Sequence, residues 1–192
     1  MTAAKALFGL RPARQKGSGA GTGGISRYRI DPAGYATAIF RGDPVLLTAG
    51  YVMKVSASTD YALGMFMGCE YNDPTTKKRI FSRYYPANTS VGTDPYGITA
   101  LVVDDYDRTF IIQADASVSV GDVGLNFEVT LGAGSTQSGN SGIGLKASTR
   151  QPSLSLLRVV DLWEAPDNAW SDAFTVVEVQ WVMHRNARLS AS

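Results

Sequence analysis

From about residue 25 onward, apolar and polar residues alternate in short runs that turn-forming residues separate. The alternation is regular near the C-terminal end, where one face of a run carries Thr175, Val177, Val179, Trp181 and Met183. A period of two is the pattern of a β-strand that is buried on one side. The opposite face carries Glu178, Gln180 and His184 among valines, which predicts a face that is partly solvated or lies at an interface.

Turn signals divide the chain into about ten such strands. The segments predicted to hold them are 34–52, 62–86, 97–115, 121–134, 153–166 and 173–185. Gly42 and Pro44 mark a turn inside the first segment, the second is predicted as a long hairpin, and residues 132–144 are predicted as an exposed loop. No run of ten or more residues shows a helical period. The predicted fold class is therefore all-β, as an antiparallel jelly-roll or a related β-barrel or sandwich.

The first 24 residues lack this pattern and differ from the rest in charge. Residues 1–30 hold six basic side chains and no acids, a charge of +6, whereas the rest of the chain holds twelve basic and seventeen acidic side chains, a charge of −5. A glycine-rich run at 17–24 links the basic start to the first strand. We therefore divide the chain into an extended basic arm, residues 1–24, and one β-barrel or sandwich body, residues 25–192.

The composition limits the cellular setting. A single cysteine, Cys69, excludes an intrachain disulfide and is typical of a protein assembled in a reducing compartment. No apolar run approaches the roughly 20 residues of a membrane helix, and Arg11 and Pro12 end the short apolar start before it could form a signal peptide. We expect a protein that is made in the cytoplasm and has no membrane partner.

The glycine run formally contains the dinucleotide-binding spacing Gly19-x-Gly21-x-x-Gly24. That fingerprint requires a strand before the loop and a helix after it, because the helix N-terminus binds the pyrophosphate. Here a segment with proline and arginine precedes the glycines, and a strand-like run follows them. A flexible linker is the better interpretation, and we expect no cofactor.

Catalytic and metal-binding sets are incomplete in this sequence. Ser141 lies in a Gly-Asn-Ser-Gly run similar to the nucleophile loop of trypsin-like proteases, but the single histidine, His184, follows it instead of preceding it. One histidine and one cysteine cannot build a zinc site, and Asp104, Asp105 and Asp107 lack the spacing of a calcium loop. Glutamates on the predicted strands form no recognisable pair for glycoside hydrolysis. We expect neither enzymatic activity nor a bound metal.

The basic arm is the strongest candidate for a binding segment. Phe8 and Leu10 precede Arg11 and Arg14, so a short apolar anchor leads into positive charge. This order suits docking on an acidic protein surface, with the glycines as a slack tether. A DNA-directed arm and a tail without a partner are the alternatives. The lack of dense basic runs and of interleaved stacking aromatics disfavours specific nucleic-acid binding.

Several segments, taken together, resemble one family. They are FGLRPAR at 8–14, YRI at 28–30, GYATAIFRGDPVLLTAGYV at 34–52, GCEYND at 68–73, IFSRYYPA at 80–87 and PDNAW at 166–170. From about Phe8 to about Val182, the chain is similar to capsid decoration, or cement, proteins of tailed bacteriophages, many of them marine or cyanobacterial phages. None of the segments is a catalytic motif, so the resemblance lies in their order and spacing.

The resemblance implies a non-enzymatic virion protein with a jelly-roll or related barrel body. Such a protein is made in the host cytoplasm and stabilises the capsid from its outer surface. The implied partner is the major capsid protein, and the implied assembly is a homotrimer. The capsid-binding role of the family's arm is carried over to Phe8, Leu10, Arg11 and Arg14.

Two tryptophans, Trp163 and Trp170, flank the Pro-Asp-Asn turn of the last motif. Large aromatic side chains are usually buried, which predicts that both plug one end of the barrel. Tryptophan is also enriched at interfaces, so one of the two is a candidate for a subunit interface.

Two other functions compete with capsid decoration. The first is another phage structural component, such as a tail, head-completion or minor capsid protein. The second is a carbohydrate-binding β-sandwich displayed on the virion.

Overall fold

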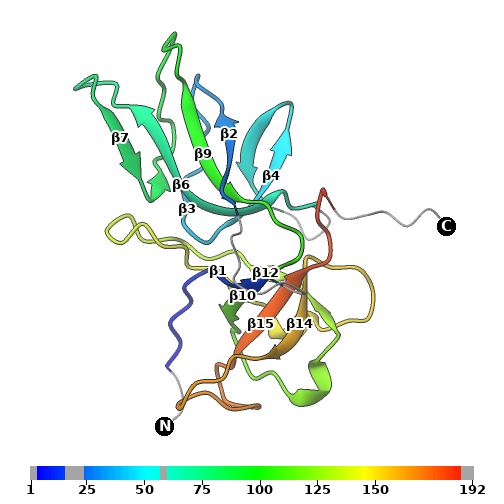
Figure 1. The fold of residues 1–192 in the computed structure, drawn as a ribbon. Helices are drawn as coiled ribbons and strands as arrows, with labels where there is room; N and C mark the ends of the chain where they lie inside the picture. Colours follow the sequence, from blue (N-terminus) through cyan, green and yellow to red (C-terminus); the bar gives the residue numbers. More distant parts are fainter. Residues whose placement is uncertain (1–3, 16–23, 57–59, 187–192) are drawn as a thin grey trace, which may run out of the picture.

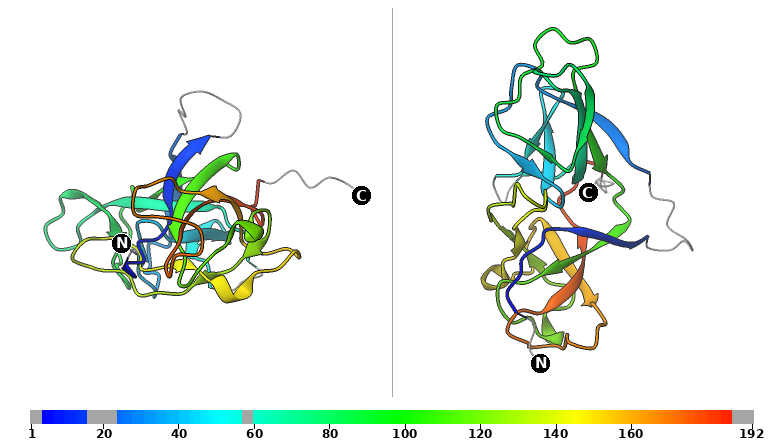
Figure 2. Two further views of the ribbon diagram at one scale, coloured as in Figure 1. Left: turned by 90° about the horizontal axis from the view of Figure 1, so that it is seen from below. Right: turned by 90° about the vertical axis from the view of Figure 1, so that its left-hand side faces the viewer.

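The computed structural model describes residues 4–15, 24–56 and 60–186. The described chain forms two stacked β-lobes, a barrel above a twisted sheet in Figure 1, and the side view in Figure 2 shows the same stacking. The all-β fold class with a barrel is therefore confirmed.

The barrel is built from strands that lie between residues 26 and 103. They are β2 (Ser26–Ile30), β4 (Pro44–Thr48), β5 (Tyr51–Lys54), β6 (Gly64–Asn72), β7 (Arg79–Ser82) and β9 (Ile98–Val103), in the order β4-β5-β2-β9-β6-β7. A second pairing, between β4 and β6, closes a ring from β4 to β6, and β7 extends the sheet from β6 outside that ring. The neighbours are antiparallel apart from β2 and β5, and β6 with β7 forms the predicted hairpin.

The lower lobe is a five-stranded antiparallel sheet. Its strands are β1 (Arg11–Gln15), β10 (Arg108–Gln113), β15 (Val176–Trp181), β14 (Leu157–Leu162) and β11 (Asn126–Phe127), in that order across the sheet. The short pairs β12 (Val129–Thr130) with β13 (Gly144–Leu145) and β3 (Ile39–Phe40) with β8 (Tyr84–Tyr85) complete the fold, with 3₁₀ turns at Val120–Asp122 and Ala147–Thr149. The residues predicted on one face of the last strand, Thr175 to Met183, are all buried.

Two of the predicted segments divide between different sheets. In 97–115, β9 pairs inside the barrel whereas β10 pairs with β1 and β15. Residues 121–134 form two short strands in different sheets, and Leu131 at their end is 62 % exposed. In both segments, long-range pairing overrides the local alternation.

The apolar core of the sheet continues into the base of the barrel. Val55, Met65 and Val103 come from barrel strands or their ends, and they pack in one cluster with Phe110 and Trp181 of the sheet. A separate cluster fills the barrel interior. The shared cluster fixes the two lobes to each other, so hollows at their boundary have defined walls.

The prediction of a free arm is wrong for residues 4–15, while residues 1–3 and 16–23 lie outside the described part. Arg11–Gln15 is the edge strand β1, which pairs with β10. Leu10 is 2 % exposed and belongs to the shared core. The physical reason is a set of partners distant in sequence: the side-chain amide of Gln113 accepts a hydrogen bond from Ala6 N and donates one to Ala4 O.

We expect Leu10→Ala to lower the free energy of unfolding by about 2–5 kcal/mol, because it leaves a cavity in the core that joins the lobes. Leu154→Ala is the matched control, since Leu154 is 69 % exposed, and its effect should stay within about 0.5 kcal/mol. Urea denaturation of the full chain measures both values. Equal stability of Leu10→Ala and the unmodified protein would show that the segment is not part of the fold.

Candidate functional site

A buried carboxylate, Asp43, lies where the two lobes meet. Its side chain is 0 % exposed, and Lys54 Nζ on β5 lies 2.9 Å from Asp43 Oδ2. The backbone N–H of Phe40 donates to the same oxygen at 2.9 Å, and Ser141 Oγ donates to Asp43 Oδ1 at 2.5 Å. A buried charge must be neutralised and hydrogen-bonded, and Asp43 meets both conditions. We call this group of four residues the Asp43 junction.

The backbone around the junction requires two glycines. Gly9 and Gly42 both have positive φ, at 76° and 97°. A Cβ on Gly9 would lie 2.7 Å from the Cβ of Ser141, and one on Gly42 would lie 3.0 Å from the carbonyl oxygen of Leu10. This close approach lets Leu10 N donate to Gly42 O at 2.9 Å. The FGLRP and GDPV segments of the sequence therefore meet in space.

Ser141 does not have the environment of a nucleophile. Its hydroxyl donates to Asp43 and accepts from the N–H of Ile143 at 3.1 Å, and the side chain is buried. His184 has other neighbours, the rings of Tyr106 and Trp181, at centroid distances of 5.6 and 5.9 Å. The prediction of an exposed loop at 132–144 missed the buried position of Ser141 beside Asp43.

His184 is buried and held as the neutral imidazole. Burial lowers the pKa of His184, against the opposing effects of the Leu63 backbone and of the Asp104 and Asp105 carboxylates. The imidazole Nδ1 accepts a hydrogen bond from the N–H of Asn186 at 3.1 Å. The segment that carries His184 is bonded to the chain before β6 through its backbone, because Ala62 N donates to Met183 O and Arg185 N donates to Ala62 O.

A polar hollow opens beside residues 8–12, and we call it the arginine pocket. It has a volume of about 380 Å³ and is lined by Phe8, Leu10, Arg11, Pro12, Arg41, Arg83 and Asn140. The Arg11 guanidinium lies over the ring of Phe8, 4.0 Å from its centroid. Three guanidinium groups around one hollow, with no carboxylate in its lining, can bind an anionic group through charge-assisted hydrogen bonds.

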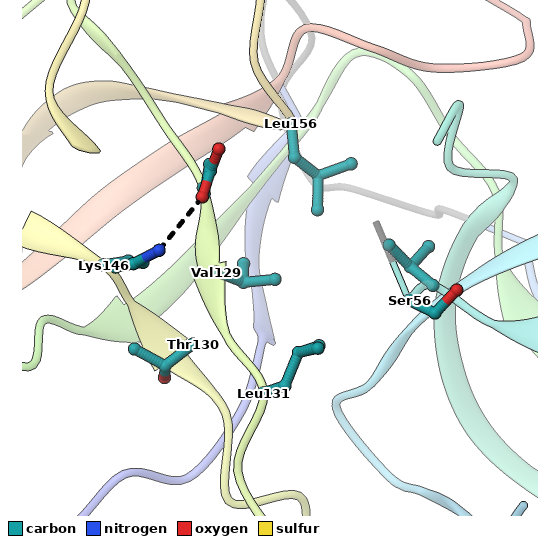
Figure 3. Close-up of a pocket in the computed structure, with 8 residues that line it drawn as sticks. Ser56, Val129, Thr130, Leu131, Lys146 and Leu156 are labelled. Carbon is teal, nitrogen blue, oxygen red and sulfur yellow. Dashed lines mark hydrogen bonds and ion pairs between the residues drawn. The ribbon is translucent and has the colours of Figure 1, made fainter. Parts of the chain in front are cut away.

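A second cleft, of about 380 Å³, lies between the end of β5 and the pair β12–β13. Figure 3 shows Val129, Leu131 and Leu156 directed into it, with Ser56 on the opposite side. Lys146 and Glu128 form an ion pair of 3.3 Å at its margin. Its walls are suited to an apolar group, and no lining residue is a cysteine or histidine.

Most other ionisable candidates are engaged in pairs. Asp104 accepts hydrogen bonds from Ser26 and Tyr28, at 2.9 and 2.6 Å. Glu70 pairs with two arginines, Arg27 and Arg79. Burial raises the pKa of the Cys69 thiol to about 12, which makes it a poor nucleophile at neutral pH.

Within the described ranges, no three histidine, cysteine or acidic side chains come together as a metal site. Gly24, the last glycine of the dinucleotide-like spacing, precedes the strand β2 instead of a helix, whereas Gly19 and Gly21 lie outside the described part. Among residues 4–15, 24–56 and 60–186, no helix is long and apolar enough to cross a membrane.

The four arm residues have different positions in the structure. Phe8 is half-buried and Arg11 is exposed, and both line the arginine pocket. Leu10 also lines the pocket, but it is almost fully buried in the core. Arg14 reaches across β10 and forms two hydrogen bonds of 2.7 Å with Glu178 on β15. This pair covers the predicted polar face of the last strand.

The two tryptophans do not plug the barrel. Trp163 is 40 % exposed, and Trp170 is half-buried against the core of the sheet. Between them, Asn168 Nδ2 donates to the carbonyls of Trp163 and Val176, and its Oδ1 accepts from Val176 N at 2.8 Å. The conformation of the PDNAW segment therefore depends on an asparagine that sequence reasoning did not single out.

The residues that sequence reasoning missed are Asp43, Lys54, Arg41 and Arg83. Arg41 and Asp43 flank Gly42 in a segment interpreted as a simple turn, and Arg83 lies after β7. Their shared positions depend on contacts between segments that are far apart in the sequence. Only Asp43 had a weak signal in the sequence. It lies directly before Pro44, and aspartate side chains in turns often accept hydrogen bonds from nearby backbone N–H groups.

Comparison of the chain with protein-family models, with curated proteins and with solved structures finds no match. The structure establishes the fold class alone, which is all-β with a closed barrel. The resemblance to capsid decoration proteins accordingly stays an expectation.

We expect Lys54→Met to lower the free energy of unfolding by about 3–5 kcal/mol, because it leaves the buried Asp43 carboxylate without a counter-charge. Lys146→Met is the matched control. Its pair with Glu128 is partly exposed on both sides, so the expected loss is below about 1 kcal/mol. Chemical denaturation at neutral pH compares the two. Similar losses in both variants would mean that the Asp43 junction does not depend on its charge.

We expect mild acid to weaken the fold through His184. The pKa of His184 is lower in the folded protein than in the unfolded chain, so the unfolded chain binds the proton first as the pH drops. The contribution of neutral His184 to the free energy of unfolding is therefore complete above about pH 6.5 and is lost as the pH falls toward the folded pKa. Thermal melts of the unmodified protein and of His184→Gln, from pH 7.5 to 5, measure this difference. The melting temperature of His184→Gln should fall less, and parallel curves would contradict the assignment.

Proposed function

We propose that the protein is a non-enzymatic structural protein of a tailed-phage virion that binds the outer capsid surface and stabilises it. The observation that carries the proposal is the meeting of two family-like segments, FGLRP and GDPV, at the Asp43 junction. Residues from both sides of this contact, Phe8, Arg11 and Arg41, line one surface hollow. The family-like residues thus support a surface site instead of a catalytic one.

The buried polar groups also favour a structural function. Lys54 and Ser141 are both bonded to Asp43, and Glu178 is bonded to Arg14. Catalytic groups need a substrate within reach of a nucleophile, acid or base. Groups saturated by partners inside the fold instead stabilise one conformation, which is what a capsid clamp requires.

The mode of docking differs from a fully free arm. Residues 4–15 are part of the fold, so deleting residues 1–24 would remove β1 and the core residue Leu10. We therefore assign the capsid contact to the exposed side of this segment, at Phe8 and Arg11. Assembly as a homotrimer would present three copies of this surface, and their modest contacts would add through effective concentration.

Purified particles test the proposal directly. We expect the chain in intact virions at a copy number comparable with that of the major capsid protein, measured by quantitative mass spectrometry. Immunogold labelling of intact particles should mark the head surface. Heads from which the protein has been stripped should release their DNA at a lower temperature, and adding the purified full chain should restore the original value.

Label on the tail, or a copy number of about a dozen or fewer as for a cyclic connector, would reject capsid decoration in favour of a tail or head-completion component. Binding of the same protein to host-cell glycans on a glycan array would instead support a carbohydrate-binding β-sandwich displayed on the virion.

A further inference from the structure

We propose that the arginine pocket binds a short, extended, acidic polypeptide segment of a protein partner. The pocket is formed by three separate parts of the chain. Arg11 lies on β1, Arg41 lies between β3 and β4, and Arg83 lies between β7 and β8. The fold thus brings one guanidinium from the lower sheet and two from the barrel side to the same hollow.

Four of the other described arginines pair with a carboxylate, whereas these three do not. Arg14, Arg27, Arg79 and Arg150 each form a salt bridge with a carboxylate. Within the part of the chain that the structure describes, Arg11, Arg41 and Arg83 form no salt bridge, and the guanidinium of Arg11 packs on Phe8. Their charges are therefore available to an anionic ligand from outside.

The backbone that presents the charges is fixed in position. Arg41 N donates to Gly139 O at 3.0 Å, and Ser141 N donates to Arg41 O at 2.9 Å. Gly139 has a φ of 74°, and a Cβ there would lie 2.6 Å from the Cβ of Arg83. This packing sets the spacing of two of the three side chains before any ligand arrives, which lowers the entropic cost of binding.

The shape of the surface favours a chain segment over a single small anion. A second hollow of about 380 Å³ shares Phe8, Arg11 and Asn140 with the arginine pocket. It continues between residues 6–8 and the loop 133–142, where Ser135 and Ser138 are part of its lining. The two hollows together form a track long enough for several residues, with charge at one end and hydroxyl groups at the other.

The charge distribution favours a peptide over a nucleic acid. Beyond residue 30 the chain holds twelve basic and seventeen acidic side chains. A polynucleotide that left the pocket in either direction would meet this net negative body, whereas a short acidic peptide ends within the track. Phe8 and Pro12 in the lining add apolar contacts that suit a polypeptide. The inference rests on the proposed function only in that a capsid protein would supply the segment.

Fluorescence anisotropy with a fluorescein-labelled hexaglutamate peptide tests the pocket in the full chain. We expect saturable binding that Arg41→Gln combined with Arg83→Gln weakens by about tenfold. Arg27→Gln is the control outside the pocket, at an exposed arginine on the barrel strand β2. It removes one positive charge where the double variant removes two, and the affinity should change less than about twofold. Arg41→Lys with Arg83→Lys should retain part of the binding, since the charge remains.

Several binding outcomes would overturn the inference. They are no binding of the peptide to the unmodified protein, equal weakening by the Arg27→Gln control, and tighter arginine-dependent binding of a thymidine hexanucleotide of similar charge. Sedimentation that shows self-association lost in the double variant would identify a second copy as the occupant and would also overturn it. If the protein binds phage heads but not the peptide, the inference is rejected and the proposed function stands. If it binds the peptide but not phage heads, the inference stands and the proposed function is rejected.

Discussion

The burial of the Asp43 carboxylate is the constraint around which the two lobes are arranged. A charge without contact to water requires a counter-charge and several donors, and these come from β5, from the end of β3 and from the loop around Ser141. Each donor fixes a different part of the chain. The barrel and the loop that faces it are thereby held in one relative position, and the nearby glycines allow the N-terminal segment to pass between them.

The N-terminal segment extends this arrangement to the lower sheet. Gln113 holds its start, the core holds Leu10, and Glu178 holds Arg14. Because the segment is bonded along its length, its remaining outward-facing groups, Phe8 and Arg11, are presented on a rigid surface. Residues 8–12, which the sequence predicted as part of a flexible arm, therefore form one wall of the preformed arginine pocket.

The sequence predicted what depends on neighbours along the chain. The alternation at 173–185 and the hairpin at 62–86 are local patterns. The structure has the buried strand face in the first segment and the β6–β7 hairpin in the second, as predicted. The burial of Leu10 was not predictable, because composition marks residues 1–24 as polar and basic while the partners of the segment lie about a hundred residues away. Phe8 and Arg11 were identified as candidates, whereas Arg41 and Arg83 were not. No local pattern connects residues that meet only through the Asp43 junction.

The position of β1 at one end of the chain has a consequence for how the molecule is made. Arg14 contacts Thr109, 95 residues later, and Glu178, 164 residues later. During synthesis the barrel strands emerge complete before either partner exists, so β1 is made early but is among the last strands to be placed. Contacts of such separation close slowly because the loop entropy is lost before they form. The charged side chains Arg11 and Arg14 on this edge strand disfavour its pairing with other chains until its partners are made.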